Sequence, residues 1–181
     1  MSDDIRCFIV VSLVDQGILK QGDIPLEYKT EETDRRNFAE VAAEKVTDMA
    51  KQQELVKAQT GMGVIFGETD DQLAYLIFVA PEYPEPAAKQ LAEKHARAVK
   101  SMAADNTFDS EAGAKQSAGA NKAYAAVCKT LATEYEGGDK VSKVMRELAV
   151  QAATTEKDNK RIDKRIDKII TLITRLEGEA E

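Results

Sequence analysis

The sequence predicts an α/β protein of the α+β kind, in which a small antiparallel sheet is sandwiched by helices and followed by one long C-terminal helix. Three observations support this prediction. Short β-branched apolar runs alternate with segments of helical periodicity over residues 5–102. A segment rich in Ala, Ser and Gly follows. The last part of the chain has no Pro or Gly between Asp139 and Glu177 and is composed almost entirely of good helix formers.

The first two predicted strands lie at the N-terminus. Residues 5–14 (IRCFIVVSLV) are apolar and β-branched on both faces, which predicts a central strand covered on both sides. A turn at 15–17 leads to a weaker strand over 18–28. Pro25 indicates an edge position for that strand, because proline has no N–H to donate to a neighbouring strand.

A helix and three strands are expected next. Thr33 is a candidate N-cap for a helix that runs to about residue 53. One face of this helix is apolar at helical spacing and is expected to lie on the sheet: Phe38, Val41, Ala42, Val46 and Met49. Residues 55–59, 62–67 and 73–80 are predicted as strands, the last two joined by a turn at 68–71.

A second helix is predicted over 87–102, after three prolines that interrupt the chain. Its apolar side contains Ala88, Leu91, His95, Val99 and Met102. These elements define a predicted domain over 1–102. Residues 103–121 (AADNTFDSEAGAKQSAGAN) are predicted to be a flexible linker. Residues 122–138 form a short helix and a Gly-Gly break, after which Asp139 is positioned to cap the long helix of 139–181.

The long helix carries an apolar stripe that fits two heptad frames. The first contains Val141, Met145, Leu148, Ala152, Thr155, Asn159, Ile162, Ile166, Ile169, Ile173 and Leu176. The second contains Val144, Leu148, Gln151, Thr155, Asp158, Ile162, Arg165, Ile169, Leu172 and Leu176. The frames share every second layer, so periodicity does not choose between them. The stripe is expected to pack on the chain's own domain, to self-associate or to capture other helices.

Composition excludes some classes of function. The net charge of -7 and a pI near 5.0 argue against nucleic-acid binding, which usually requires a basic face. The basic run over 157–168 is interpreted as a solvated helix face with ion pairs such as Glu156 with Lys160. Cys7 and Cys128 have no metal or redox spacing and are predicted to be free thiols in a reducing compartment.

The sequence contains little that predicts an enzyme. His95, the single histidine, lies on an apolar stripe and is expected to pack there with its polar tip satisfied locally. The glycines of 61–67 do not have phosphate-loop spacing and are expected to serve backbone bends. No catalytic motif, metal site or cofactor site is predicted.

Membrane attachment is not expected from the chain itself. Asp3 and Asp4 stand where a signal peptide carries basic residues. The longest apolar runs have the length of strands and are too short to span a bilayer. Lipidation signatures are absent as well. If the protein works on a membrane, we expect its anchor to be missing from this chain.

The order of elements over 5–102 resembles the longin (profilin-like) domain. The similarity includes the step Glu82-Tyr83-Pro84 between the last strand and its helix (FVAPEYPEPAAKQLAEKHARAV). In longin-type SNAREs a linker and one SNARE helix follow, as they do here. The start of the long helix, DKVSKV with Glu147-Leu148, is similar to the start of an R-SNARE motif. When the two helices are compared without a gap, Arg165 takes the position of the family's central arginine. Ile169 and Leu172 then take the positions of the next two layers.

The resemblance implies a role in vesicle trafficking and membrane fusion. The protein would be cytoplasmic, on the cytosolic face of endomembranes. Its partners would be SNARE-like helices that contribute three glutamines around the arginine. The implied partner-binding layers are Val141, Val144, Leu148, Thr155, Ile162, Arg165, Ile169, Leu172 and Leu176. The longin domain would select partners or hold the helix back by an intramolecular contact, through a groove at Phe38, Val41, Ala42, Val46 and Met49.

The sequence departs from the family in two places, and it also fits a rival hypothesis. Asp158 occupies a layer that should be apolar, and the chain ends soon after Leu176. The rival is a non-fusogenic longin-like adaptor that forms a homo-oligomeric coiled coil in the more apolar frame. Its inward residues would then include Met145, Ala152, Asn159, Ile166 and Ile173.

Overall fold

The computed structural model describes residues 4–15, 19–49, 51, 56–104 and 118–179. In chain order the elements are β1 (Ile5–Ser12), β2 (Leu26–Lys29), α1 (Phe38–Met49), β3 (Val56–Thr60), β4 (Gly63–Thr69), β5 (Leu73–Val79), α2 (Glu85–Ala104), α3 (Ala118–Glu134) and α4 (Lys140–Glu179). The strands form one antiparallel sheet in the order β2-β1-β5-β4-β3. The predicted α+β class, the element order and the long C-terminal helix are confirmed.

The chain divides into two compact units, Met1–Asp139 and Lys140–Glu181. The first unit includes α3, which the sequence had placed outside a domain of residues 1–102. The reason is that α3 buries Tyr124, Cys128 and Leu131 in the core that α2 also covers. Residues 118–121 belong to this helix and not to the predicted linker. Residues 105–117, the rest of that linker, lie outside the described part of the chain.

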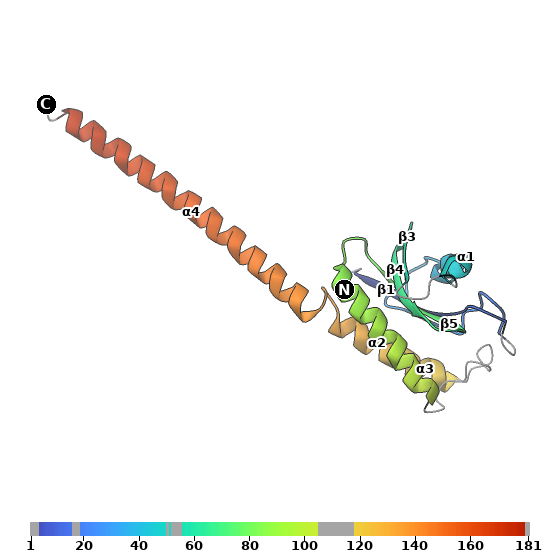
Figure 1. Cartoon of the computed structure of the whole chain (residues 1–181). Coiled ribbons are helices and arrows are strands. Elements are labelled where there is room, and N and C mark those ends of the chain that lie inside the picture. The colour runs from blue at the N-terminus through green and yellow to red at the C-terminus, as the bar shows by residue number, and fades with distance from the viewer. Residues whose placement is uncertain (1–3, 16–18, 50, 52–55, 105–117, 180–181) are drawn as a thin grey trace. The chain divides into compact units, whose positions relative to one another are not determined.

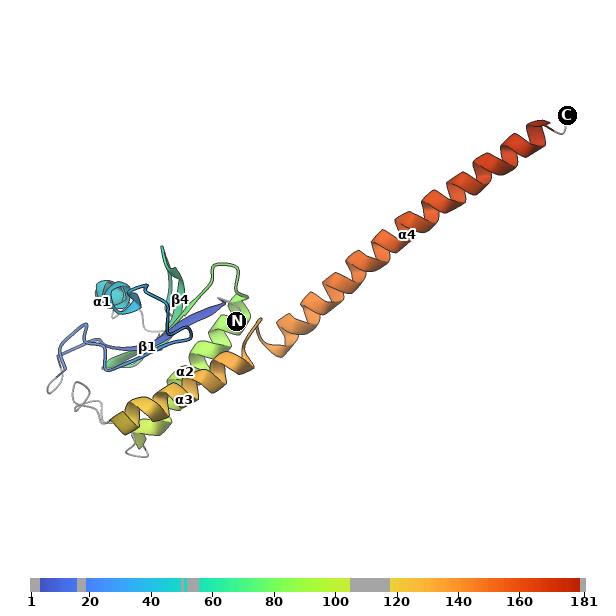
Figure 2. The same cartoon turned by 180° about the vertical axis from the view of Figure 1, so that it is seen from behind.

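The sheet separates two apolar clusters, because alternate side chains of a strand point to opposite faces. On β1, Phe8 and Val10 contribute to the cluster under α2 and α3, whereas Ile9 and Val11 contribute to the cluster under α1. β5 alternates in the same way. Figures 1 and 2 show α1 on one face of the sheet and α2 and α3 side by side on the other. The predicted sandwich is therefore present, and β2 is an edge strand as Pro25 indicated.

Helix α1 starts later than predicted. The Asp34 carboxylate accepts a hydrogen bond from the backbone N–H of Arg36 at 2.9 Å and forms an ion pair with its guanidinium at 2.6 Å. These contacts hold a turn before the helix. Asn37 is the N-cap instead of Thr33: its Oδ1 accepts from the N–H of Glu40 at 3.2 Å, and its Nδ2 donates to the Glu40 carboxylate at 3.0 Å.

Helix α2 matches its predicted apolar side, and α3 is attached to the first unit by polar contacts. The five stripe residues of α2 are all buried: Ala88, Leu91, His95, Val99 and Met102. The Tyr83 hydroxyl donates to the carbonyl of Tyr135, just after α3, at 2.7 Å. The Tyr124 hydroxyl of α3 lies 2.8 Å from Nε2 of His95.

The two cysteines are free, as predicted, and both are buried. Burial raises the pKa of the Cys128 thiol to about 12 and that of Cys7 further still. A thiol with so high a pKa holds little of the reactive thiolate near neutral pH. Cys7 and Cys128 therefore act as small core residues.

We expect Gly63→Ala to destabilise the first unit by about 2 to 4 kcal/mol, because it adds both a clash and a strained backbone angle. Gly63 has φ of 125°, and an added Cβ would overlap the carbonyl oxygen of Val79. All five tyrosines lie before Asp139, so urea denaturation followed by tyrosine fluorescence reports on this unit alone.

Gly61→Ala is the matched control, since an added Cβ there has no atom within 4 Å. Its denaturation midpoint should equal that of the native protein. Equal midpoints for all three proteins would contradict the strained geometry at Gly63.

Candidate helix-assembly site

Helix α4 forms from local interactions along its own sequence. Asp139 stands at the N-cap position, directly before Lys140. Glu156 and Lys160 form the predicted i,i+4 ion pair at 2.8 Å. Threonine hydroxyls along the polar side donate back to carbonyls four residues earlier, for example Thr171 to Asp167 at 2.9 Å. A helix of 40 residues spans about 60 Å at 1.5 Å per residue.

The apolar side chains of α4 are exposed along its whole length. Their exposed fractions run from 47% at Ile166 to 68% at Val141. The set comprises Val141, Val144, Met145, Leu148, Val150, Ile162, Ile166, Ile169, Ile170, Leu172, Ile173 and Leu176. Large exposed apolar patches on proteins mark interaction surfaces. This stripe is therefore the strongest candidate site of the chain.

The two heptad frames of α4 describe one broad face. In the first frame Ile166 and Ile173 join the shared layers, and in the second Arg165 and Leu172 do. Residues of both sets lie next to the shared layers on a helical surface, so the face covers about three of every seven positions. A two-stranded coiled coil needs only two of seven. The width of the face favours a bundle of more than two helices.

The direction in which the stripe runs along α4 is the one expected for a helix that packs in a coiled coil. An exact seven-residue repeat drifts about 20° per heptad around a straight α-helix. Val141 and Ile162 are three heptads apart in the first frame, with polar residues at Thr155 and Asn159 between them, so the line that joins the layers turns by about 60°. Helices follow such a drift by winding into a left-handed supercoil. A flat protein surface would instead favour a stripe that runs straight along the helix.

Arg165 lies inside the apolar face and is exposed. Ile162 and Ile169 are one turn before and after it, and Leu172 follows two turns later. A guanidinium has five donors and is costly to bury unless acceptors surround it. A bundle that buries Arg165 therefore needs partner helices with acceptors at the same height, and an Arg in this position restricts the register of assembly.

The middle of α4 departs from an ideal seam. Thr155, Asp158 and Asn159 are polar, and all three are exposed. The apolar face is therefore strongest in two parts, one around Met145 and one from residue 162 to 176. Ile162, Ile166, Ile169 and Ile173 make the second part the more apolar of the two.

The residues of α1 that were predicted to line a groove do not form an open groove in the structure. Phe38 and Ala42 are fully buried, and the Phe38 ring packs on Phe78 with ring centroids 5.0 Å apart. Val41 is half-buried. The side chains of Val46 and Met49 lie outside the described part of the structure. Phe38 and Ala42 are thus core residues that a partner does not reach in this arrangement.

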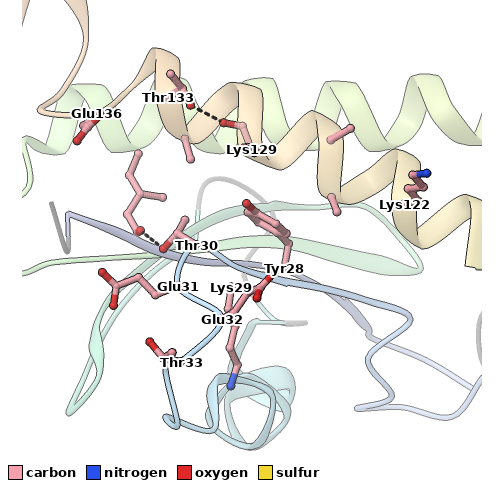
Figure 3. A pocket seen from close by; sticks show the side chains of 14 residues that line it. Tyr28, Lys29, Thr30, Glu31, Glu32, Thr33, Lys122, Lys129, Thr133 and Glu136 are labelled. Carbon is pink, nitrogen blue, oxygen red and sulfur yellow. Dashed lines mark hydrogen bonds between the residues drawn. The ribbon is translucent and has the colours of Figure 1, made fainter. Parts of the chain in front are cut away.

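A second candidate surface is a groove of about 910 Å³ between β2 and α3. Figure 3 shows α3 along one side of the groove and residues 30–33 along the other, with Tyr28 between them. Thirteen further residues line it: Ile5, Lys29, Thr30, Glu31, Glu32, Thr33, Lys122, Ala125, Ala126, Lys129, Ala132, Thr133 and Glu136.

Sequence reasoning missed this groove because its two walls are about one hundred residues apart in the chain. One local signal was present. Lys122, Ala126, Lys129 and Thr133 recur at helical spacing on the side of α3 opposite its buried residues, and small side chains between lysines leave room over that face. The pattern does not say which strand lies beneath it.

His95 lies in the core and not in a reactive site. It is fully buried, and its ring packs edge-on against Phe8 with centroids 5.3 Å apart. Its Nδ1 has no hydrogen-bond partner within the described residues, while Nε2 is paired with Tyr124. Burial lowers the pKa of His95 to about 3, so the ring is neutral at physiological pH. The described residues also hold no cluster of His, Cys, Asp or Glu suited to a metal ion.

Comparison of the chain with protein-family models, with curated proteins and with solved structures finds no match. Among the described helices, none combines the length and the hydropathy that crossing a membrane requires.

We expect the free energy of unfolding to fall as the pH is lowered from about 6.5 toward about 3 because of His95. The unfolded histidine titrates near pH 6.5, so between these values the unfolded chain binds a proton that the folded chain excludes. The slope from this one group is at most about 1.4 kcal/mol per pH unit. Urea denaturation at several pH values, followed by tyrosine fluorescence, measures it.

His95→Leu provides the comparison, because the chain has no other histidine and the carboxylates are unchanged. The variant loses the partner of Tyr124, so only its slope with pH is compared and not its absolute stability. We expect a shallower decline in the variant. Parallel curves for the two proteins would show that His95 is not held neutral.

Proposed function

We propose that the chain is a longin-type, R-SNARE-like protein of vesicle trafficking and membrane fusion that acts on the cytosolic face of endomembranes. Helix α4 assembles with partner helices, and the first unit regulates this assembly or selects the partners. The observation that carries the proposal is the apolar face of α4, whose large side chains are exposed in two parts, from Val141 to Val150 and from Ile162 to Leu176. The proposal assigns no catalytic role to any residue.

The layout of the first unit supports the longin part of the proposal. The sheet order β2-β1-β5-β4-β3 is antiparallel throughout, with α1 on one face and α2 and α3 on the other. This matches the small sheet between helices that the resemblance implies. Tyr83, in the acidic-aromatic-proline step, is buried and bonded to Tyr135, so the step has a structural role at the start of α2.

The proposed mechanism is mechanical. Burying one Ile or Leu side chain contributes about 1.5 to 3 kcal/mol. In the proposed mechanism, the free energy released when the face from Ile162 to Leu176 is buried in a bundle draws two attached surfaces together. Arg165 sets the register, because only an alignment that brings acceptors to its guanidinium avoids an unpaired buried charge.

The second candidate function is a non-fusogenic longin-like adaptor that self-associates through α4. It is favoured by one specific observation: isoleucine occupies both kinds of core position in the first frame, at Ile162, Ile166, Ile169 and Ile173. Isoleucine at both positions favours trimers or tetramers over dimers. In this candidate Arg165 lies at the margin of the core.

For the SNARE-like function we expect Arg165→Leu to weaken capture of glutamine-bearing partner helices at least fivefold. Partner amides left without a donor cost about 1 to 3 kcal/mol. The measurement is a pull-down from cytosol and detergent-solubilised membranes with the full chain as bait, quantified by mass spectrometry. Lys164→Leu makes the same change on the opposite side of α4 and should leave capture unaltered. Recovery of the bait alone with the native chain would reject this function.

For the adaptor function we expect Ile166→Asp to abolish self-association and Arg165→Ala to leave it nearly unchanged. Ile166 would be a core residue of the homo-oligomer, and a carboxylate there is buried without a partner. Sedimentation velocity of the full chain over a range of concentrations reports the oligomer. A native chain that stays monomeric at every concentration would eliminate the adaptor.

A further inference from the structure

The outer edge of β2 carries backbone groups that are directed away from the sheet. The N–H of Thr30 donates to the carbonyl of Arg6 at 3.1 Å, and hydrogen-bonded pairs alternate along an antiparallel ladder. By this alternation Tyr28 is bonded to Phe8, whereas Glu27 and Lys29 direct their N–H and C=O groups outward. In the described part of the chain no strand pairs with this edge.

The groove begins beside Tyr28 and Lys29 at the end of this edge, continues along residues 30–33 and has room for a polypeptide backbone. Its volume of about 910 Å³ lies in the range typical of ligand sites. Above it, α3 presents small side chains at Ala125, Ala126 and Ala132. Small side chains let an added strand approach closely, and the ring of Tyr28 supplies apolar surface between the walls.

The lysines of α3 occupy one half of its wall of the groove, with Lys129 midway between Lys122 and Glu136, and Glu32 lines the opposite wall. Lys122 and Lys129 project from α3, and neither has an ion pair among the residues that the structure describes. Glu31 and Glu136 lie at the other end, as Figure 3 shows. Lys29 does not alter this pattern, because its ammonium group donates to the carbonyls of Asp34 and Arg36 at 3.2 and 2.8 Å.

We propose that this groove binds an extended peptide of a partner protein, added antiparallel to β2 with its acidic end at Lys122 and Lys129. β2 runs from the end near Lys122 toward Glu31. An antiparallel strand therefore has its N-terminal part beside Glu31 and Glu136 and its C-terminal part beside the lysines. In this orientation, a peptide with basic residues at its N-terminus and acidic residues at its C-terminus is complementary in charge to both ends of the groove. The same peptide bound parallel to β2 is repelled at both ends.

The edge itself limits which peptides can bind. β2 has only four residues, Pro25 precedes it, and Lys29 lies on it. Short, charged edges with a nearby proline discourage indiscriminate strand pairing. Because the backbone groups of Glu27 and Lys29 offer few hydrogen bonds, charge at the two ends of the groove decides which peptide is accepted.

The test compares two fluorescein-labelled hexapeptides of identical composition, Lys-Val-Ala-Val-Asp-Glu and Glu-Asp-Val-Ala-Val-Lys, binding to the full chain by fluorescence anisotropy. We expect the first to bind at least fivefold more tightly. Lys129→Glu should remove this preference, and Ala126→Phe should abolish binding by filling the groove from an exposed position. Lys20→Glu, an exposed lysine that does not line the groove, is the charge-matched control and should bind as the native chain does.

Hydrogen exchange of residues 26–30 gives a second readout that does not depend on the label. The first peptide should slow exchange there by an amount that follows its binding curve. Equal affinity of the two peptides, or no binding of either at 1 mM peptide, would overturn the proposal. Protection of 26–30 that rises with protein concentration and without peptide would also overturn it, because a second copy would then occupy the edge.

Discussion

The first unit depends on the antiparallel pairing of β1 with β5. These strands lie at the centre of the sheet, and Ile9, Val10 and Val11 of β1 expose none of their surface. A strand that is apolar on both faces requires cover on both, which explains why α1 lies on one side and α2 with α3 on the other. The pairing joins residues about 65 positions apart in the chain. The pairing of β1 with β5 therefore also constrains where β2, α1, β3 and β4, which lie between them in the chain, can be placed.

Polar contacts determine how α3 lies on this core. Two buried hydrogen bonds join segments that are far apart in the chain. One is between the Tyr124 hydroxyl and His95, and the other is between the Tyr83 hydroxyl and the carbonyl of Tyr135. A buried hydroxyl without a hydrogen-bond partner costs more free energy than the hydrogen bond itself contributes to stability. Orientations of α3 that break these two bonds are therefore disfavoured. The groove over β2 exists because α3 is held there, so the proposed peptide site is a consequence of the way the core is packed.

The two units differ in how much of their apolar side chains they bury. The first unit has covered its large apolar side chains almost completely, and Val14 is the only one on it, within the described residues, that ranks as exposed. Along α4 every large apolar side chain is about half exposed or more. Helix propensity and the ion pair of Glu156 with Lys160 favour such a helix, but they leave its apolar face in water. Either proposed function supplies what the face lacks, which is a set of neighbouring helices.

Several features of this protein were determined by the sequence alone because they depend on local order. The two-sided apolar run of β1, the one-sided stripe of α2 and the heptad pattern of α4 are patterns among residues that are near neighbours in the chain. The edge position of β2 was indicated by a single residue, Pro25. The tertiary structure decided the rest. It assigned α3 to the first unit, moved the start of α1 to Phe38 through the contacts of Asp34 with Arg36, and made Phe38 and Ala42 core residues. It also brought α3 beside β2, so that Lys129 and Tyr28 line one groove. Each of these depends on contacts between side chains, some of them far apart in the chain, and periodicity carries no information about such contacts.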